Sequence, residues 1–115
     1  RPGLKETFGI EPSDAELDAM VELLRLGGGD QLLPRTIRYI EERRANQDRF
    51  TAGLTSFEGP LTALWGSLDP IAVVAMMDHL AELRPQTEIV RWADVGHWPS
   101  LEAPDRVTRA ILDRL

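Results

Sequence analysis

The first half of the chain carries apolar residues at helical spacing. Four of them follow one another at i, i+3, i+4 and i+7: Leu17, Met20, Val21 and Leu24. This spacing predicts one apolar face of a helix. Ser13 and Glu16 stand before the stripe at the spacing of a capping box, which predicts the helix start. The glycines at 27–29 predict a helix–helix turn, because no strand precedes them and no Lys-Ser/Thr pair follows to make a phosphate loop.

Residues 33–57 form a second region of helical pattern. Pro34 suits a first helical turn, and apolar residues recur toward both ends of the region. The stretch 43–49 is polar on every side and predicts a break into two helices. The sequence therefore predicts helices and no strand from 13 to 57. Residues 1–12, with two prolines and two glycines, are predicted to be irregular.

The pattern changes after residue 60. Short apolar runs at 61–65 and 87–92 predict strands, the first of them buried on both faces. Helical spacing predicts a helix at 71–83 and a last helix that opens at Pro104. A strand, a helix and a second strand in this order favour a parallel pair joined by a right-handed connection. The predicted fold class is α/β, with helices first and a β-α-β-α unit after them.

Each predicted strand is followed by a loop that carries a chemically useful side chain. Asp69 lies four residues after Trp65, and His97 lies five residues after Trp92. Because ligands gather beyond the carboxyl ends of parallel strands, the two side chains are expected to meet there. A carboxylate beside an imidazole fixes its tautomer and stabilises the imidazolium that forms when the ring takes a proton.

Structural roles compete with this chemical interpretation. Asp69 followed by Pro70 is also an ordinary helix start, and a single histidine in a turn is more often structural than catalytic. Asp94 is a rival acid, although it shares a loop with His97 and a local turn role is favoured for it. His79 is predicted to lie on the polar surface of a helix beside acidic neighbours.

Composition removes several classes of function. The chain has a formal net charge of −6, which disfavours nucleic acid and anionic membranes as partners. No apolar run approaches the ~20 residues of a membrane span, and no signal-peptide pattern is visible. With two histidines and no cysteine, a metal site is not expected, and no cofactor is predicted. The absence of cysteine leaves the compartment open, with the cytoplasm as the default.

Two motifs resemble the last third of an α/β-hydrolase. The sequence Trp-Gly-Ser-Leu-Asp-Pro at 65–70 is similar to the turn that carries the acid of that family. The sequence Gly-His-Trp-Pro-Ser-Leu-Glu-Ala-Pro at 96–104 is similar to its histidine loop and final helix. Their order and separation also suit the family. The resemblance implies that Asp69 and His97 are catalytic residues.

The helical part resembles the family's lid less specifically. The stretch 38–44 is similar to epoxide-hydrolase-like and dehalogenase-like members. The resemblance implies a lid over residues 1–45 and the carboxy-terminal part of the hydrolase core over 46–115. Tyr39 is a candidate donor to an epoxide oxygen, although a packing or surface role is favoured. Trp98 is the second candidate for contact with a substrate.

One expected element of that family is missing from the sequence. No Gly-x-Ser-x-Gly or Gly-x-Asp-x-Gly nucleophile motif occurs, and the chain starts at Arg1 rather than Met. We therefore expect a carboxy-terminal portion of a hydrolase, inactive alone, whose partner is a missing amino-terminal half or a second copy of the chain. The complete enzyme is expected to hydrolyse an ester, an epoxide or a related small apolar substrate. The alternative is a non-catalytic α/β binding or regulatory module.

Overall fold

The computed structural model describes residues 2–115 and divides the chain into two compact units. One unit, called the core unit here, joins the residues up to Leu17 with Pro60–Leu115. The other, called the helical unit, is Asp18–Gly59.

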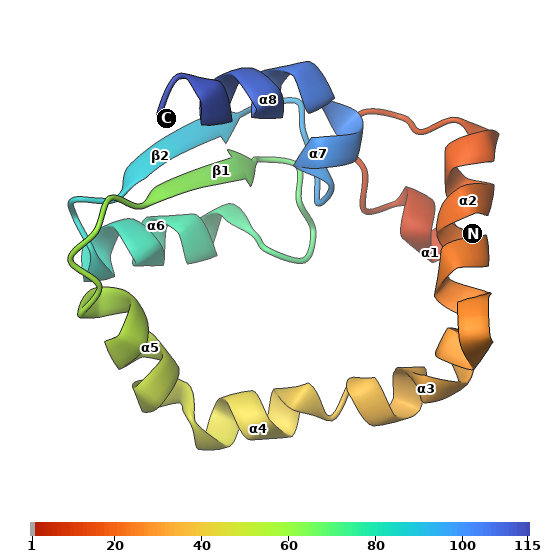
Figure 1. The fold of residues 1–115 in the computed structure, drawn as a ribbon, viewed down its shortest axis with the longest axis horizontal. Helices are drawn as coiled ribbons and strands as arrows, with labels where there is room; N and C mark the ends of the chain where they lie inside the picture. The colour runs from red at the N-terminus through yellow and green to blue at the C-terminus, as the bar shows by residue number, and fades with distance from the viewer. Residues whose placement is uncertain (1) are drawn as a thin grey trace. The chain divides into compact units, whose positions relative to one another are not determined.

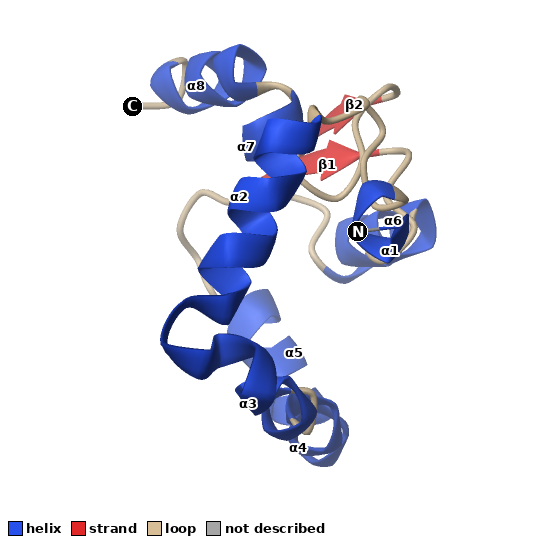
Figure 2. Cartoon of the chain, turned by 90° about the vertical axis from the view of Figure 1, so that its right-hand side faces the viewer, coloured by secondary structure: helices blue, strands red, loops and turns tan. Residues whose placement is uncertain are grey.

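The core unit is built on a parallel two-stranded sheet. Strand β1, Thr62–Gly66, pairs with strand β2, Glu88–Trp92, from Thr62 opposite Glu88 to Gly66 opposite Trp92. Helix α6, Val74–Leu83, connects the strands, and helix α8, Pro104–Leu112, lies on the other side of the sheet (Figures 1 and 2). This arrangement confirms the predicted α/β class with two parallel strands. Both strands end level at the same edge of the sheet.

The remaining elements are short helices. Their bounds are Pro2–Lys5 (α1), Asp14–Arg25 (α2), Gly29–Thr36 (α3), Tyr39–Ala45 (α4), Gln47–Thr55 (α5) and Pro99–Glu102 (α7), with a 3₁₀ turn at Leu26–Gly28. Gly27 and Gly28 both have positive φ, at 63° and 78°, which glycine adopts without steric cost. The predicted helix–helix turn at 27–29 is therefore confirmed. None of the helices in residues 2–115 is long and apolar enough to cross a membrane.

Residues 13–57 are helical and contain no strand, as predicted, but the second region breaks twice. The first break separates α3 from α4, where the amide of Arg38 bonds the Arg35 carbonyl at 3.3 Å and that of Ile40 bonds Ile37 at 3.2 Å. These three-residue bonds tighten the turn beyond Pro34, which has no amide hydrogen to donate. The second break is at Asn46, whose side chain donates to the Glu42 carbonyl at 2.9 Å.

Three other boundaries differ from the sequence prediction. Helix α3 begins at Gly29 rather than near 33, so Pro34 lies inside this helix and not in its first turn. Helix α1 lies in a stretch predicted to be irregular, and the Thr7 amide and hydroxyl close it on the Leu4 carbonyl at 3.1 and 2.6 Å. Helix α6 begins at Val74 rather than at 71. The Trp65 indole donates to the Ala72 carbonyl at 2.9 Å, which removes that carbonyl from the helical ladder.

Burial is confined to the core unit. Its buried apolar side chains are Leu17, Met77, Val95, Ala103 and Ala110. No residue of 18–59 is buried, so the apolar stripe predicted for α2 is buried only at Leu17. Residues 62–65 of β1 are half-buried, whereas the sequence predicted burial on both faces. The reason is that β1 pairs only with β2 among the described residues and so forms an edge of the sheet.

Candidate active site

The loops that follow the two strands are bonded to each other. The Ser67 amide donates to the Trp92 carbonyl at 2.8 Å, and the Leu68 amide donates to the Val95 carbonyl at 2.9 Å. Gly66 is required at this junction, because an added Cβ would lie 2.5 Å from the Val95 carbonyl oxygen. The first loop is thus held against the second just before Asp69.

Asp69 and His97 form a hydrogen bond between these loops. Oδ2 of Asp69 lies 2.8 Å from Nδ1 of His97, and their side chains are 8% and 29% exposed. Oδ1 of Asp69 accepts the amides of Ile71 and Ala72 at 2.7 and 2.9 Å. The expected meeting of the two side chains is confirmed as geometry, and the competing role as a local cap is fulfilled by the same carboxylate.

The electrostatic setting favours an ionised Asp69. Burial by itself raises the pKa of the Asp69 carboxyl, but the bond to His97 and the amides of Ala72 and Ile71 outweigh burial. The pKa of Asp69 is therefore held below its ordinary value. An ionised carboxylate only accepts hydrogen bonds, so its contact with Nδ1 requires the proton to be on that nitrogen.

The other ring nitrogen of His97, Nε2, has no hydrogen-bond partner among the described residues. His97 is one of the residues that line a hollow of about 160 Å³. This hollow is lined by Leu64, Trp65, Gly66, Asp69, Ala72, Gly96, His97 and Pro99. The arrangement leaves one imidazole nitrogen without a hydrogen-bond partner among the described residues, as a group that accepts a proton requires.

The amino-terminal segment also contacts the histidine loop, which sequence reasoning missed. The His97 amide donates to the Thr7 carbonyl at 2.8 Å. Glu102 accepts amides from this segment and from the histidine loop, including those of Gly9 and Gly96 at 2.8 Å. No motif or spacing signals the contacts of Thr7 and Gly9, because these residues lie 90 positions or more from their partners in the sequence.

The other candidate residues occupy different settings. The Trp98 ring lies edge-on to His97 with ring centres 5.1 Å apart, and its indole nitrogen donates to the Thr7 hydroxyl at 2.6 Å. Tyr39 belongs to the helical unit, at the first residue of α4, and is 55% exposed. Asp94 pairs with Arg106 of α8 through two bonds of 2.7 and 2.8 Å.

The Arg106 guanidinium lowers the pKa of the Asp94 carboxyl. Asp94, the alternative acid to Asp69, is therefore paired with an arginine and not with His97. His79 lies on the surface of α6, with Nδ1 3.5 Å from a Glu82 oxygen and 66% of its side chain exposed. Residues 2–115 hold no group of three or more potential ligands that would suit a metal ion.

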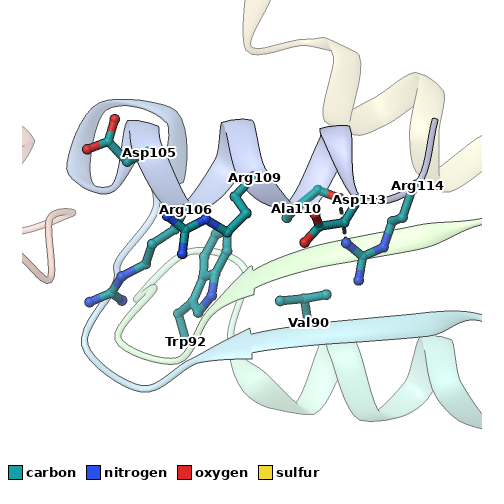
Figure 3. Close-up of a pocket in the computed structure, with 8 residues that line it drawn as sticks. All are labelled: Val90, Trp92, Asp105, Arg106, Arg109, Ala110, Asp113 and Arg114. Carbon is teal, nitrogen blue, oxygen red and sulfur yellow. Dashed lines mark hydrogen bonds between the residues drawn. The ribbon is translucent and has the colours of Figure 1, made fainter.

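A second pocket, of about 330 Å³, lies between β2 and α8, and none of its lining residues lines the hollow at His97. Trp92 extends from the end of β2 toward α8, whose arginines border the opening (Figure 3). Two of them are engaged elsewhere, Arg106 by Asp94 and Arg114 by both oxygens of Glu88 at 2.6 and 2.7 Å. The pocket therefore presents Arg109 as its one cation without an acidic partner among the described residues.

Comparison with known proteins relates the chain to hydrolases. It is 33% identical over 103 residues to the "Putative hydrolase LipZ" of Mycobacterium tuberculosis, a match over 90% of this chain and 36% of that protein. It is 27% identical over 106 residues to the mesoderm-specific transcript protein of Mus musculus, which it covers by 32%. The chain thus spans about a third of the length of the curated relatives it matches.

One solved structure matches 56% of this chain and 25% of its own, with a TM-score of 0.51 and 28% sequence identity. This structure is described as "Est816 as an N-Acyl homoserine lactone degrading enzyme". No protein-family model matches the sequence. In sequence and in fold the chain is thus similar to part of a putative hydrolase and to part of a lactone-degrading enzyme.

Proposed function

We propose that the chain supplies the acid, Asp69, and the general base, His97, of a hydrolase with a nucleophile–histidine–acid triad. The observation that carries this proposal is the 2.8 Å bond between Asp69 Oδ2 and His97 Nδ1, together with a second ring nitrogen that has no partner in the described part of the chain. In a histidine held in this way, one ring nitrogen is fixed by the carboxylate and the other can exchange a proton with a reacting group.

In the proposed mechanism, Nε2 of His97 removes a proton from a serine hydroxyl or from the attacking water. Asp69 keeps the ring in the required tautomer and stabilises the imidazolium that forms. The proton is then returned to the leaving group. General base catalysis of this kind contributes about 10²- to 10⁴-fold to a rate.

The nucleophile is proposed to come from the amino-terminal portion of a hydrolase. The absence of a nucleophile motif within these 115 residues supports this source. We further propose that the helices before residue 46 form part of a lid. Tyr39 and Trp98 would then contact the substrate.

The proposed substrates are small apolar esters or epoxides. A serine nucleophile would serve esters and related acyl compounds, whereas an aspartate nucleophile would open an epoxide. The structural match to an enzyme described as degrading an N-acyl homoserine lactone supports acyl substrates. The resemblance of residues 38–44 to epoxide-hydrolase-like members supports the other class.

Complementation tests the proposal. The chain is mixed with the region of LipZ that it does not match, and hydrolysis of p-nitrophenyl acetate and of styrene oxide is measured. We expect no turnover by the chain alone and measurable turnover by the mixture. His97→Ala should abolish this turnover. His79→Ala, which removes the other histidine on an exposed helix surface, should leave it unchanged. Turnover that survives His97→Ala would contradict the proposal.

A further inference from the structure

The backbone on both sides of His97 is held by one carboxylate. Oε2 of Glu102 accepts the Gly96 amide at 2.8 Å, and Oε1 accepts the Trp98 amide at 3.0 Å. The amide of His97 itself donates to the Thr7 carbonyl at 2.8 Å. Three consecutive amides around the proposed base are therefore bonded outside their own loop. The position of the ring depends on these bonds, because the side chain follows its backbone.

The same carboxylate binds the amino-terminal segment. Oε2 of Glu102 also accepts the amides of Gly9 and Ile10, both at 2.8 Å. Burial by itself raises the pKa of Glu102, but its four amide donors outweigh burial and hold that pKa below its ordinary value. The group is thus an ionised acceptor shared by two segments that are distant in the sequence.

A close backbone contact reinforces this link. An added Cβ on Gly9 would lie 2.6 Å from the Gly96 nitrogen and 2.7 Å from the Asp94 carbonyl oxygen. An added Cβ on Gly96 would in turn collide with the Gly9 nitrogen. The two strips of backbone lie directly against each other, so neither can move without the other.

Local helix capping does not account for these bonds. Glu102 is the last residue of α7, and a reach back to the Trp98 amide resembles an ordinary cap. That role does not require bonds to Gly9 and Ile10, which lie 93 and 92 positions away. The arrangement has the form of a clamp between the histidine loop and the segment that leads into α2.

We propose that Glu102 is a positioning residue for His97, and that its carboxylate fixes the direction of Nε2 by clamping residues 9–10 to residues 96–98. The inference rests on the proposed role of His97 as the general base. Glu102 touches no reacting atom in this proposal and acts only through the backbone that carries the imidazole.

The decisive variant is Glu102→Gln. It preserves shape, but one of its two terminal atoms becomes an amide group that donates hydrogen bonds and faces backbone donors. In the 115-residue chain, NMR should show the Nδ1–H proton of His97 displaced or broadened. Hydrogen exchange of the Gly96 and Trp98 amides should accelerate roughly 10- to 100-fold. In the complemented enzyme, kcat should fall with little change in KM.

Two controls separate positioning from loss of stability. Glu6→Gln makes the same chemical change on an exposed side chain of the amino-terminal segment, for which the structure gives no bond. Met77→Ala removes a buried core side chain of α6 and lowers global stability. Under folded conditions neither should move the His97 signal. If Glu102→Gln does not fold, Glu102→Asp keeps the charge, shortens the reach and should show a smaller displacement.

The outcomes distinguish this inference from the proposed function. A normal His97 signal and normal amide exchange in a folded Glu102→Gln or Glu102→Asp variant would overturn the positioning role, even in an enzyme that needs His97. An equal displacement of the His97 signal in Met77→Ala would overturn it as well. A displaced signal seen only on substitution of Glu102, in a protein without hydrolysis, would support the clamp and reject the catalytic proposal.

Discussion

Asp69 binds His97 with one carboxylate oxygen and its own turn with the other. Oδ2 is 2.8 Å from Nδ1 of His97, whereas Oδ1 accepts the amides of Ile71 and Ala72. The two roles fix the orientation of the carboxylate, because a flip would exchange the partners of both oxygens. A substitution that keeps only one acceptor oxygen must therefore fail in one of the roles.

Asp69→Asn should reverse the tautomer of His97. The remaining oxygen is needed by the two backbone amides, so the amide group would donate toward Nδ1 and leave the proton on Nε2. The ¹⁵N shifts of the ring should report this exchange of protonated nitrogen. In a complemented enzyme kcat should fall by about 10⁴. Asp94→Asn, on the same loop as His97 but paired with Arg106, should preserve the original tautomer.

Gly9→Ala should destabilise the chain by about 1–3 kcal/mol, because the new methyl group would overlap the backbone of the histidine loop. Urea unfolding followed by circular dichroism measures the change. Gly53→Ala is the matched control, since a Cβ there meets nothing within 4 Å and the residue lies inside α5. That control should be neutral or stabilising by up to about 1 kcal/mol. An equal loss of stability in both variants would reject the backbone contact.

Acid should weaken the fold partly through Glu102. The pKa of Glu102 is lower in the folded chain than its ordinary value, so the folded state binds fewer protons than the unfolded state in the interval between the two values. The stabilisation is complete above the ordinary pKa of about 4.3 and is lost as the pH falls through the folded value. Urea midpoints between pH 6 and pH 3 should decline less steeply in Glu102→Gln than in Glu6→Gln. Equal slopes would contradict this assignment.

The open edge of β1 should be covered in solution. Within the described residues β1 pairs only with β2, and large apolar side chains of the core unit such as Ile71 and Leu112 are 58% and 64% exposed. Such surfaces favour association. Sedimentation analysis of the isolated chain should therefore give a mass above 12.9 kDa, and the unfolding temperature should rise with concentration. A concentration-independent monomer with cooperative unfolding would reject this expectation.

Sequence reasoning found the elements that depend on local periodicity. The helices of 13–57, the two parallel strands and the meeting of Asp69 with His97 all follow from spacing and from the geometry of parallel strands. The resemblance of two loops to a known family added the expectation of a hydrolase. Hydrolase relatives support that expectation, while the catalytic roles remain predictions.

The contacts that sequence reasoning missed are long-range backbone bonds. Nothing in the pattern around Thr7 or Gly9 marks them as partners of residues 96–98, since their carbonyl and amide groups are common to every sequence. The late start of α6 was missed for a related reason, because it depends on a tryptophan side chain that takes a backbone carbonyl. Spacing encodes which face of an element is apolar, but it does not encode which loop lies beside it.

The turn between β2 and α7 should be intolerant of any change in length. Nearly every backbone group from Trp92 to Trp98 that the structure pairs has a partner in a different segment: Ser67, Leu68, Thr7 or Glu102. One inserted residue would move His97 out of register with Thr7 and present the imidazole on another side of the turn, although the motif itself would read unchanged. Related sequences should accordingly vary in length before β1, where 56–61 form an exposed connection, and keep a fixed spacing here. A related chain with a different number of residues between β2 and α7 would then be expected to lack the function, even if its histidine motif were unchanged.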